Sequence, residues 1–120
     1  MASRESAVAR AEAYLRAHLD APLPVSRLCR IAGVSERGLR AAFSSVRGTS
    51  PKRWIVAERL RRVRTVLCDE AATPATVTVA AAEYGFYELG RFAGLYRNAF
   101  GEAPSDTLRS TTRKKRRSHV

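Results

Sequence analysis

Two arginines three residues apart, Arg37 and Arg40, are the side chains in this sequence best suited to contact base edges. They fall on a helix predicted over residues 36–47. One arginine can donate two hydrogen bonds to O6 and N7 of a guanine, and a good pair of this kind discriminates against other bases by about 1–3 kcal/mol. The alternative for both arginines is a solvated surface position or a contact to a phosphate.

The same predicted helix buries Leu39 and Phe43, so its opposite side presents the candidate base contacts. The Glu36 carboxylate can accept a hydrogen bond from a cytosine amino group. An acid in the first turn is equally favoured by the helix dipole, which is the other explanation for this residue. The candidate base contacts on this helix are Glu36, Arg37, Arg40 and Ala41.

The chain of 120 residues carries a formal net charge of +11, from 22 lysines and arginines against 11 acidic residues. Such an excess favours a polyanionic partner, with a nucleic acid first and an anionic membrane surface second. Hydrophobic residues make up 45% of the sequence, which is enough for a core. We therefore expect one domain, or two very small ones, rather than a disordered chain.

The sequence offers little material for a metal site or for catalysis. Cys29 and Cys68 form no C-x-x-C pair, and His18 and His119 are not spaced as co-ligands, so no metal or cofactor is expected. We predict that both cysteines are buried thiols of a reducing cytoplasm. No nucleophile–base pair, carboxylate dyad or phosphate-binding glycine loop argues for an enzyme. No membrane-length apolar run or signal-peptide core is present, so we expect a cytoplasmic, nucleoid-associated protein.

A helix predicted from Pro51 to Cys68 organises the rest of the chain. Ser50 can cap its first backbone N–H groups, and proline suits the first helical position because no N–H is needed there. One side of the helix is apolar and includes Trp54, which we expect in the core rather than as a stacking surface for bases. The other side is basic. At 1.5 Å per residue, the helix would be roughly 27 Å long.

The remaining periodicity predicts an all-α fold of seven helices, with no competing strand pattern. The expected helices span residues 5–19, 25–32, 36–47, 51–68, 77–84, 88–100 and 104–109. Other aromatic residues expected in the core are Tyr14, Tyr84, Phe86, Phe92 and Tyr96. Residues 110–120 have no apolar periodicity, so we predict a disordered basic tail there.

Residues 25–34 are weakly repeated by residues 77–86, with Gly33 opposite Gly85. After this turn the second copy has one extra residue, and the shifted alignment brings Gly48 opposite Gly101. The pattern of each copy predicts a helix, a turn and a second helix. Glycine suits the turn because it tolerates positive φ. The chain is therefore divided into a first helix-turn-helix subdomain (1–49), a linker helix (50–69), a second helix-turn-helix subdomain (70–109) and the tail (110–120).

Three runs of the sequence carry a resemblance to a known family. They are L-C-x-x-A-G-V-S-x-x-x-L-x-x-x-F from Leu28, G-x-S-P-x-x-W-I-x-x-x-R-L from Gly48, and the second G-F followed by F-x-x-x-Y-R-x-x-F-G-x-x-P from Phe92. Over about residues 5–109, the chain resembles the DNA-binding domain of AraC/XylS-type transcription regulators. The resemblance implies two helix-turn-helix subdomains joined by a long central helix. It also implies double-stranded DNA and RNA polymerase as partners, with an effector acting only through a separate domain.

The second expected recognition helix is chemically poorer than the first. At the positions that match the first helix's arginines and alanine it presents Gly90, Ala93 and Gly94, whereas the family often has an arginine at the last of these. Two glycines in a helix each cost about 1 kcal/mol relative to alanine, so a compensating gain is expected. One hypothesis is a close approach of backbone to DNA, with base contacts from Tyr87, Glu88 and Gly90.

The competing hypothesis, which we favour, is that the second subdomain mainly holds phosphates and the first supplies most of the sequence discrimination. The expected phosphate ligands are Ser35, Lys52, Arg91, Arg97 and Arg109. With about six phosphates neutralised, log K should fall against log salt with a slope of roughly −5. The basic tail could add affinity that does not depend on sequence.

These features predict a sequence-specific binder of double-stranded DNA whose single chain reads two adjacent major-groove segments. The alternative is a basic nucleic-acid-binding protein that is indifferent to sequence. Its affinity ratio between any site and random DNA would be near one, whereas a regulator favours its site by roughly a thousandfold or more. A membrane-surface binder is the third class, and its helices would be unfolded in water.

Overall fold

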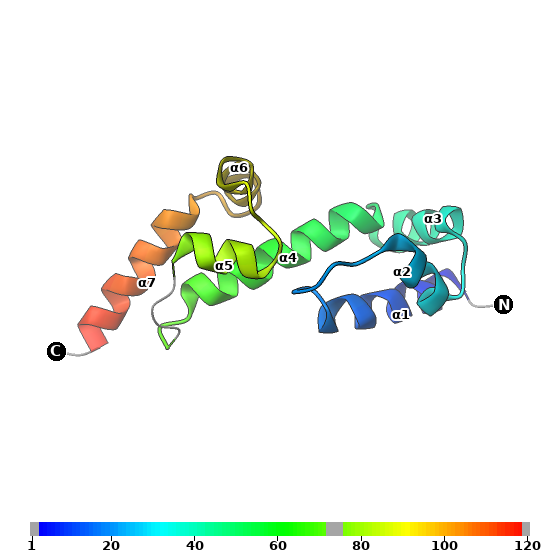
Figure 1. The fold of residues 1–120 in the computed structure, drawn as a ribbon, viewed down its shortest axis with the longest axis horizontal. Helices are drawn as coiled ribbons and strands as arrows, with labels where there is room; N and C mark the ends of the chain where they lie inside the picture. Colours follow the sequence, from blue (N-terminus) through cyan, green and yellow to red (C-terminus); the bar gives the residue numbers. More distant parts are fainter. Residues whose placement is uncertain (1–2, 72–75, 119–120) are drawn as a thin grey trace. The chain divides into compact units, whose positions relative to one another are not determined.

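The computed structural model describes residues 3–71 and 76–118, and every regular element in them is a helix (Figure 1). The helices are α1 (Arg4–Ala17), α2 (Val25–Ala32), α3 (Glu36–Arg47), α4 (Pro51–Cys68), α5 (Val77–Glu83), α6 (Leu89–Phe100) and α7 (Pro104–Ser118). The prediction of an all-α fold with seven helices is confirmed for the described residues. Helices α2, α3 and α4 have their predicted bounds, and α1, α5 and α6 differ from prediction by one or two residues at an end.

Hydroxyl side chains cap the starts of several helices, including the Ser50 cap that was predicted. Oγ of Ser50 accepts a hydrogen bond from the backbone N–H of Arg53 at α4 (3.2 Å), and Oγ1 of Thr76 accepts one from Val79 at α5 (3.1 Å). A cap of this kind stabilises a helix by about 1 kcal/mol.

The prediction of a disordered tail from residue 110 is wrong as far as Ser118, because α7 continues through it. Thr111 is only 8% exposed, so the helix is packed beyond the end predicted at residue 109. The Thr111 hydroxyl donates to the carbonyl of Thr107 (3.1 Å), and the Thr112 hydroxyl donates to that of Leu108 (3.0 Å). Lysine and arginine also have high helix propensity. Residues 119–120 of the predicted tail lie outside the described residues.

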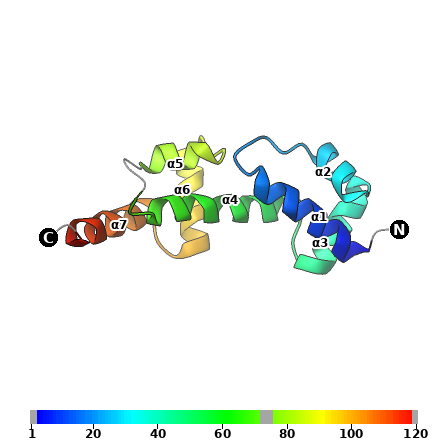
Figure 2. The same ribbon diagram turned by 90° about the horizontal axis from the view of Figure 1, so that it is seen from below.

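The chain forms two compact units, residues 1–58 and 59–120, whose boundary falls within α4. In the first unit, α1 packs against both α2 and α3 (Figure 2). The Phe43 and Trp54 rings meet edge to face with centroids 6.1 Å apart, and Trp54 is 8% exposed, which confirms its predicted core position. The buried core of this unit consists of Ala7, Val8, Ala11, Leu15, Leu28, Ala32, Leu39, Ala42, Phe43 and Trp54.

A buried carboxylate links α1 to α3 in the first unit. Glu12 is 3% exposed and accepts three hydrogen bonds from the Arg47 guanidinium, at 2.7–3.2 Å. These bonds to Glu12 raise the pKa of Arg47. The Arg16 guanidinium lies 3.6 Å from the same carboxylate and 5.4 Å from the centre of the Trp54 ring. The buried negative charge is therefore compensated, as burial of a charge requires.

Aromatic rings fill the core of the second unit. Phe92 and Tyr96 are buried, and their centroids are 5.7 Å apart, while Phe86 packs 5.0 Å from Phe92 and Phe100 lies 4.7 Å from Tyr96. Both views show α5 beside the C-terminal half of α4 (Figures 1 and 2). Figure 1 looks nearly along the axis of α6 while α5 lies across the view, so these two helices cross steeply.

Some predicted core positions are only partly buried. Tyr14, Tyr84 and Phe86 are intermediate rather than buried. The prediction of two buried thiols is wrong for Cys68, which is exposed, and Cys29 is only half-buried. Cys68 is the last residue of α4, one helical step past the fully buried Leu67, so it turns out of the core.

Candidate nucleic-acid interface

The two helix–turn–helix segments, α2–α3 and α5–α6, share the backbone geometry of their turns. Gly33 and Gly85 both have positive φ, at 72° and 87°. The N–H of the residue after each glycine bonds to the carbonyl four residues before the glycine, Val34 to Cys29 (3.1 Å) and Phe86 to Ala81 (2.9 Å). The sequence repeat is thus also a repeat of this hydrogen bond.

The second helices of the two segments also end alike. Gly48 after α3 and Gly101 after α6 have φ of 68° and 75°. Their N–H groups bond to the carbonyls of Ser44 (3.0 Å) and Arg97 (2.8 Å), which are matching positions in the shifted alignment. All positive-φ residues among those described are these four repeat-related glycines, so the duplication extends over both helices of each segment.

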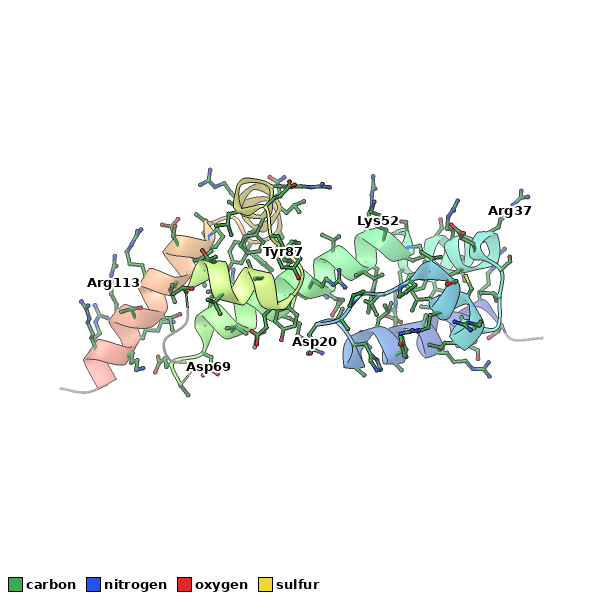
Figure 3. The ribbon with its side chains drawn as sticks, in the orientation of Figure 1. Asp20, Arg37, Lys52, Asp69, Tyr87 and Arg113 are labelled. Carbon is green, nitrogen blue, oxygen red and sulfur yellow. The ribbon has the colours of Figure 1, made fainter. Side chains whose placement is uncertain are left out.

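The exposed side of α3 carries the charged residues predicted to contact bases. Arg37 is exposed, its guanidinium has no hydrogen bond or ion pair within the described residues, and its side chain extends away from α3 in Figure 3. Arg40 instead forms an exposed ion pair with Glu36, with Nη2 2.5 Å from Oε1. Ala41 lies on the same side and is exposed. The guanidinium of Arg37 is therefore available to a ligand, whereas that of Arg40 first has to leave Glu36 or bind together with it.

Ser35 begins α3, and its hydroxyl already has a structural role. Its Oγ accepts a hydrogen bond from the backbone N–H of Gly38 (3.0 Å), and the hydroxyl hydrogen remains able to donate to a phosphate. Lys52, another predicted phosphate ligand of the first unit, is exposed in the first turn of α4 and points away from it in Figure 3.

The start of α6 differs from that of α3. Glu88 occupies the N-cap position, but its side chain makes no capping hydrogen bond. Tyr87 at the preceding turn is 79% exposed (Figure 3). Gly90 is exposed, and a Cβ added there, or at Gly94 one turn later, would meet no atom within 4 Å. This surface therefore has an aromatic ring, a carboxylate and open backbone where α3 has arginines.

Arg59 of α4 lies against the turn between α5 and α6. Its Nη1 is 3.7 Å from the position that a Cβ on Gly85 would take. Burial lowers the pKa of Arg59, and the Tyr87 phenol opposes this effect electrostatically. Arg59 is thus a partly buried cation beside the turn that precedes Tyr87.

The remaining predicted phosphate ligands lie on α6 and α7. Arg91 and Arg97 are exposed on α6 and have no side-chain partner within the described residues. Arg109 forms an exposed ion pair with Asp106 at 3.2 Å, so a phosphate would compete with that carboxylate. In the first turn of α7, Thr107 is buried and hydrogen-bonded to Tyr96 and Glu102, which removes it from the surface.

The sequence reasoning missed two features of the second unit. Leu89, the first residue of α6, is 41% exposed beside the predicted contacts, and its only signal was an apolar residue at a helix start. An open pocket of about 360 Å³ lies between α5 and α7, lined by Val77, Ser105, Leu108, Arg109, Thr112, Arg113 and Arg116. Arg113 projects from α7 in Figure 3. The positive charge of residues 110–118 was evident from the sequence, but their helical conformation was not predicted.

Within the described ranges, no helix combines the length and hydropathy that a membrane crossing requires. The same residues contain no group of three or more histidine, cysteine, aspartate or glutamate side chains placed to hold a metal ion. His119, one of the two histidines considered above, is not among them.

Comparisons with known proteins agree with this architecture. A family model described as "Helix-turn-helix domain" matches residues 28–110. The solved structure of a probable AraC family transcriptional regulator from Rhodopseudomonas palustris CGA009 has a TM-score of 0.82 and 42% identity, and the match covers 88% of this chain and 96% of that one. For an AraC-type DNA-binding domain-containing regulator from Chromobacterium violaceum, the TM-score is 0.81 with 25% identity, over 89% and 93% of the two chains.

Curated relatives are longer proteins. The XylDLEGF operon transcriptional activator of Pseudomonas putida is 42% identical over 96 residues, which are 80% of this chain and 30% of that protein. The probable thc operon regulatory protein of Rhodococcus erythropolis is 39% identical over 97 residues, or 81% of this chain and 29% of that protein. The chain spans less than a third of the length of these relatives.

Proposed function

Because the chain belongs to the AraC/XylS-type family of helix-turn-helix domains, we propose that it binds double-stranded DNA at specific sequences and regulates transcription. The observation that carries this proposal is the duplicated helix–turn–helix geometry, in which both turns and both second-helix ends repeat their hydrogen bonds. A net charge of +11 supports a polyanionic partner. In this proposal α3 and α6 enter successive major-groove segments, and one chain contacts both.

The proposed base contacts come from the first turns of the two second helices. On α3 they are Glu36, Arg37, Arg40 and Ala41, and at the start of α6 they are Tyr87, Glu88 and Gly90. Arg37 is the strongest of these because it is exposed and unpaired among the described residues. The proposed phosphate ligands are Ser35, Lys52, Arg91, Arg97 and Arg109, which fix the position on DNA without reading it.

Partners beyond DNA follow from the relatives. The Pseudomonas putida protein is described as a transcriptional activator, which supports RNA polymerase as a further partner of this chain. Any effector would act through a separate domain, since the relatives extend well beyond the matched region. The chain would act on the nucleoid in the cytoplasm, without an enzymatic activity of its own.

Selection of bound sites from random duplex DNA, followed by footprinting, tests the proposal. We expect one enriched sequence with two protected major-groove segments about one helical turn apart, with one chain per site. Affinity for this site should exceed that for random DNA by roughly a thousandfold or more. Recovery of unenriched DNA, bound as tightly as any other duplex, would instead support the sequence-indifferent binder.

A further inference from the structure

Most of the exposed large apolar side chains that the structure describes lie in the α5–α6 segment. The structure describes four such residues, Val25, Val79, Tyr87 and Leu89, and the last three belong to this segment. Tyr87 and Leu89 are 79% and 41% exposed and stand on either side of Glu88, where α6 begins. The N-cap and first helical residue of α3, Ser35 and Glu36, correspond to Glu88 and Leu89, so the position of Leu89 is charged in the first segment.

Packing within the second unit does not account for these apolar side chains. Phe86 and Phe92 stack on each other, while the Tyr87 ring stacks on none of the described rings. The open surface continues along the helix, since neither Gly90 nor Gly94 has a neighbour within 4 Å of an added Cβ. Leu89 and Tyr87 therefore border a helix whose backbone a ligand can approach closely.

A major-groove edge presents one apolar group to a protein, the C5-methyl of thymine, and apolar side chains recognise it by contact. The proposed function requires α6 to lie in the major groove. There, the thymine methyl is the apolar group that Tyr87 and Leu89 can contact and shield from water. We infer that the second unit reads thymine methyl groups through Leu89 and Tyr87. The Glu88 carboxylate, which has no capping bond, would accept from a cytosine amino group beside them and disfavour other bases.

This inference rests on the proposed function and adds that the two units recognise different bases. The first unit would discriminate guanine through Arg37, and the second would discriminate thymine by removing its methyl group from water. The contribution of each methyl would be modest, because burying one methyl-sized group is worth about 0.8 kcal/mol, or roughly a fourfold change in affinity.

Deoxyuridine substitution tests the inference, because it removes the methyl and leaves the hydrogen-bonding edge of the base unchanged. The test duplex carries the site that the full chain selects from random DNA. Its two half-sites are assigned with Arg37→Ala, because this variant should lose base discrimination only in the half-site that the first unit contacts. Replacing each thymine of the other half-site by deoxyuridine should weaken binding roughly fourfold at a contacted position. Replacing thymines in the first half-site should change affinity less than twofold.

Variants assign the methyl contact to individual side chains. Leu89→Ala or Tyr87→Ala should bind thymine and deoxyuridine duplexes equally at the position each residue contacts. Val25→Ala, which truncates an exposed apolar residue of the other unit, should keep the full deoxyuridine effect. Thermal unfolding of each variant shows whether the fold is retained, and Leu89→Met should retain the effect if folding limits Leu89→Ala.

Failure of the inference differs from failure of the proposed function. Guanine lacking N7 in the first half-site should weaken binding through Arg37 in either case, provided that the chain reads DNA. If it does so while deoxyuridine in the second half-site has no effect, the methyl contact is wrong and the proposed function stands. A second half-site without an enriched thymine would also overturn the inference. If no sequence is enriched at all, the proposed function itself fails.

Discussion

Helices α3 and α6 end the two repeated segments with the same backbone and nearly opposite surfaces. Both follow a glycine at positive φ, bury two large residues one turn apart, and stop at another positive-φ glycine. On the exposed side, however, Arg37 and Arg40 of α3 correspond to Gly90 and Ala93 of α6. The turn and core residues are thus alike in the two segments, whereas the exposed faces of their second helices differ.

The two units also differ in the polar groups that link their helices. In the first, the Glu12 carboxylate receives the Arg47 guanidinium between α1 and α3. In the second, the Tyr96 hydroxyl donates to Thr107 (2.8 Å), which donates to Glu102 (2.8 Å). Burial raises the pKa of the Tyr96 phenol above its usual range. An arginine–carboxylate pair links the helices of the first unit, whereas a chain of two hydroxyls that ends on a carboxylate does so in the second.

The largest expected effect is on stability, from truncating Phe43 of α3, which corresponds to Tyr96 of α6. Phe43→Ala removes a fully buried side chain of the first unit, and it should lower the free energy of unfolding by about 3–5 kcal/mol. Denaturant titration followed by circular dichroism measures the loss. Ala41→Ser on the exposed side of the same helix is the control and should change stability by less than about 0.5 kcal/mol. A loss below about 1 kcal/mol for Phe43→Ala would contradict the packing of this ring in the core of the first unit.

Removing the unpaired arginine of α3 should affect binding strongly and stability little. Arg37→Ala should weaken binding to the selected site by about 1–3 kcal/mol and make one guanine position tolerant of other bases. Arg4→Ala, an exposed arginine at the start of α1, is the matched control for the lost charge. Competition titrations with each base at that position measure the change. Equal losses for all four bases would show that Arg37 contacts a phosphate.

The hydroxyl link of the second unit can be tested by removing one oxygen. Tyr96→Phe keeps the ring but leaves Thr107 without its donor, so stability should fall by about 0.5–1.5 kcal/mol. Tyr14→Phe, in a half-buried tyrosine of the first unit whose hydroxyl accepts from Arg27 (3.3 Å), should cost less. Equal denaturation midpoints for Tyr96→Phe and the unaltered chain would contradict the link.

Glycine at position 94, on the exposed side of α6, should make the unbound protein less stable than alanine would. Gly94→Ala meets no atom within 4 Å, so it should stabilise the chain by about 0.5–1 kcal/mol. Close approach of the α6 backbone to DNA would make the same substitution weaken binding to the selected site. Gly85→Ala is the contrasting variant, because φ of 87° makes any side chain there destabilising. If Gly94→Ala leaves affinity unchanged, close approach of the α6 backbone to DNA is excluded.

Neutralising arginines in the C-terminal part of α7 should change the preference among bases least of all these substitutions. Arg113→Gln with Arg116→Gln should reduce the slope of log K against log salt by about 2 if both arginines contact phosphates, without changing base preference. Arg4→Gln with Arg30→Gln removes the same charge from the first unit and should leave the slope unchanged. An unchanged slope for the α7 variant would mean that this helix does not reach DNA.

The sequence predicted what depends on local residue type. Glycine at 33, 48, 85 and 101, and serine at 35 and 50, determine where helices turn, end and begin, and apolar spacing located the buried rings. It did not predict features that depend on how neighbouring side chains meet. The burial of Thr111 that extends α7, the pairing of Arg40 with Glu36 and the exposure of Leu89 each follow from packing or partner choice in three dimensions.

The most direct test of the account is base exchange in each half of the selected site, with affinity measured for the full chain. The account predicts one chain per site and unequal losses. Scrambling the half-site read by α3 should abolish most of the discrimination over random DNA, whereas scrambling the half-site read by α6 should cost clearly less. Equal losses in the two halves, or two chains bound at each site, would contradict it.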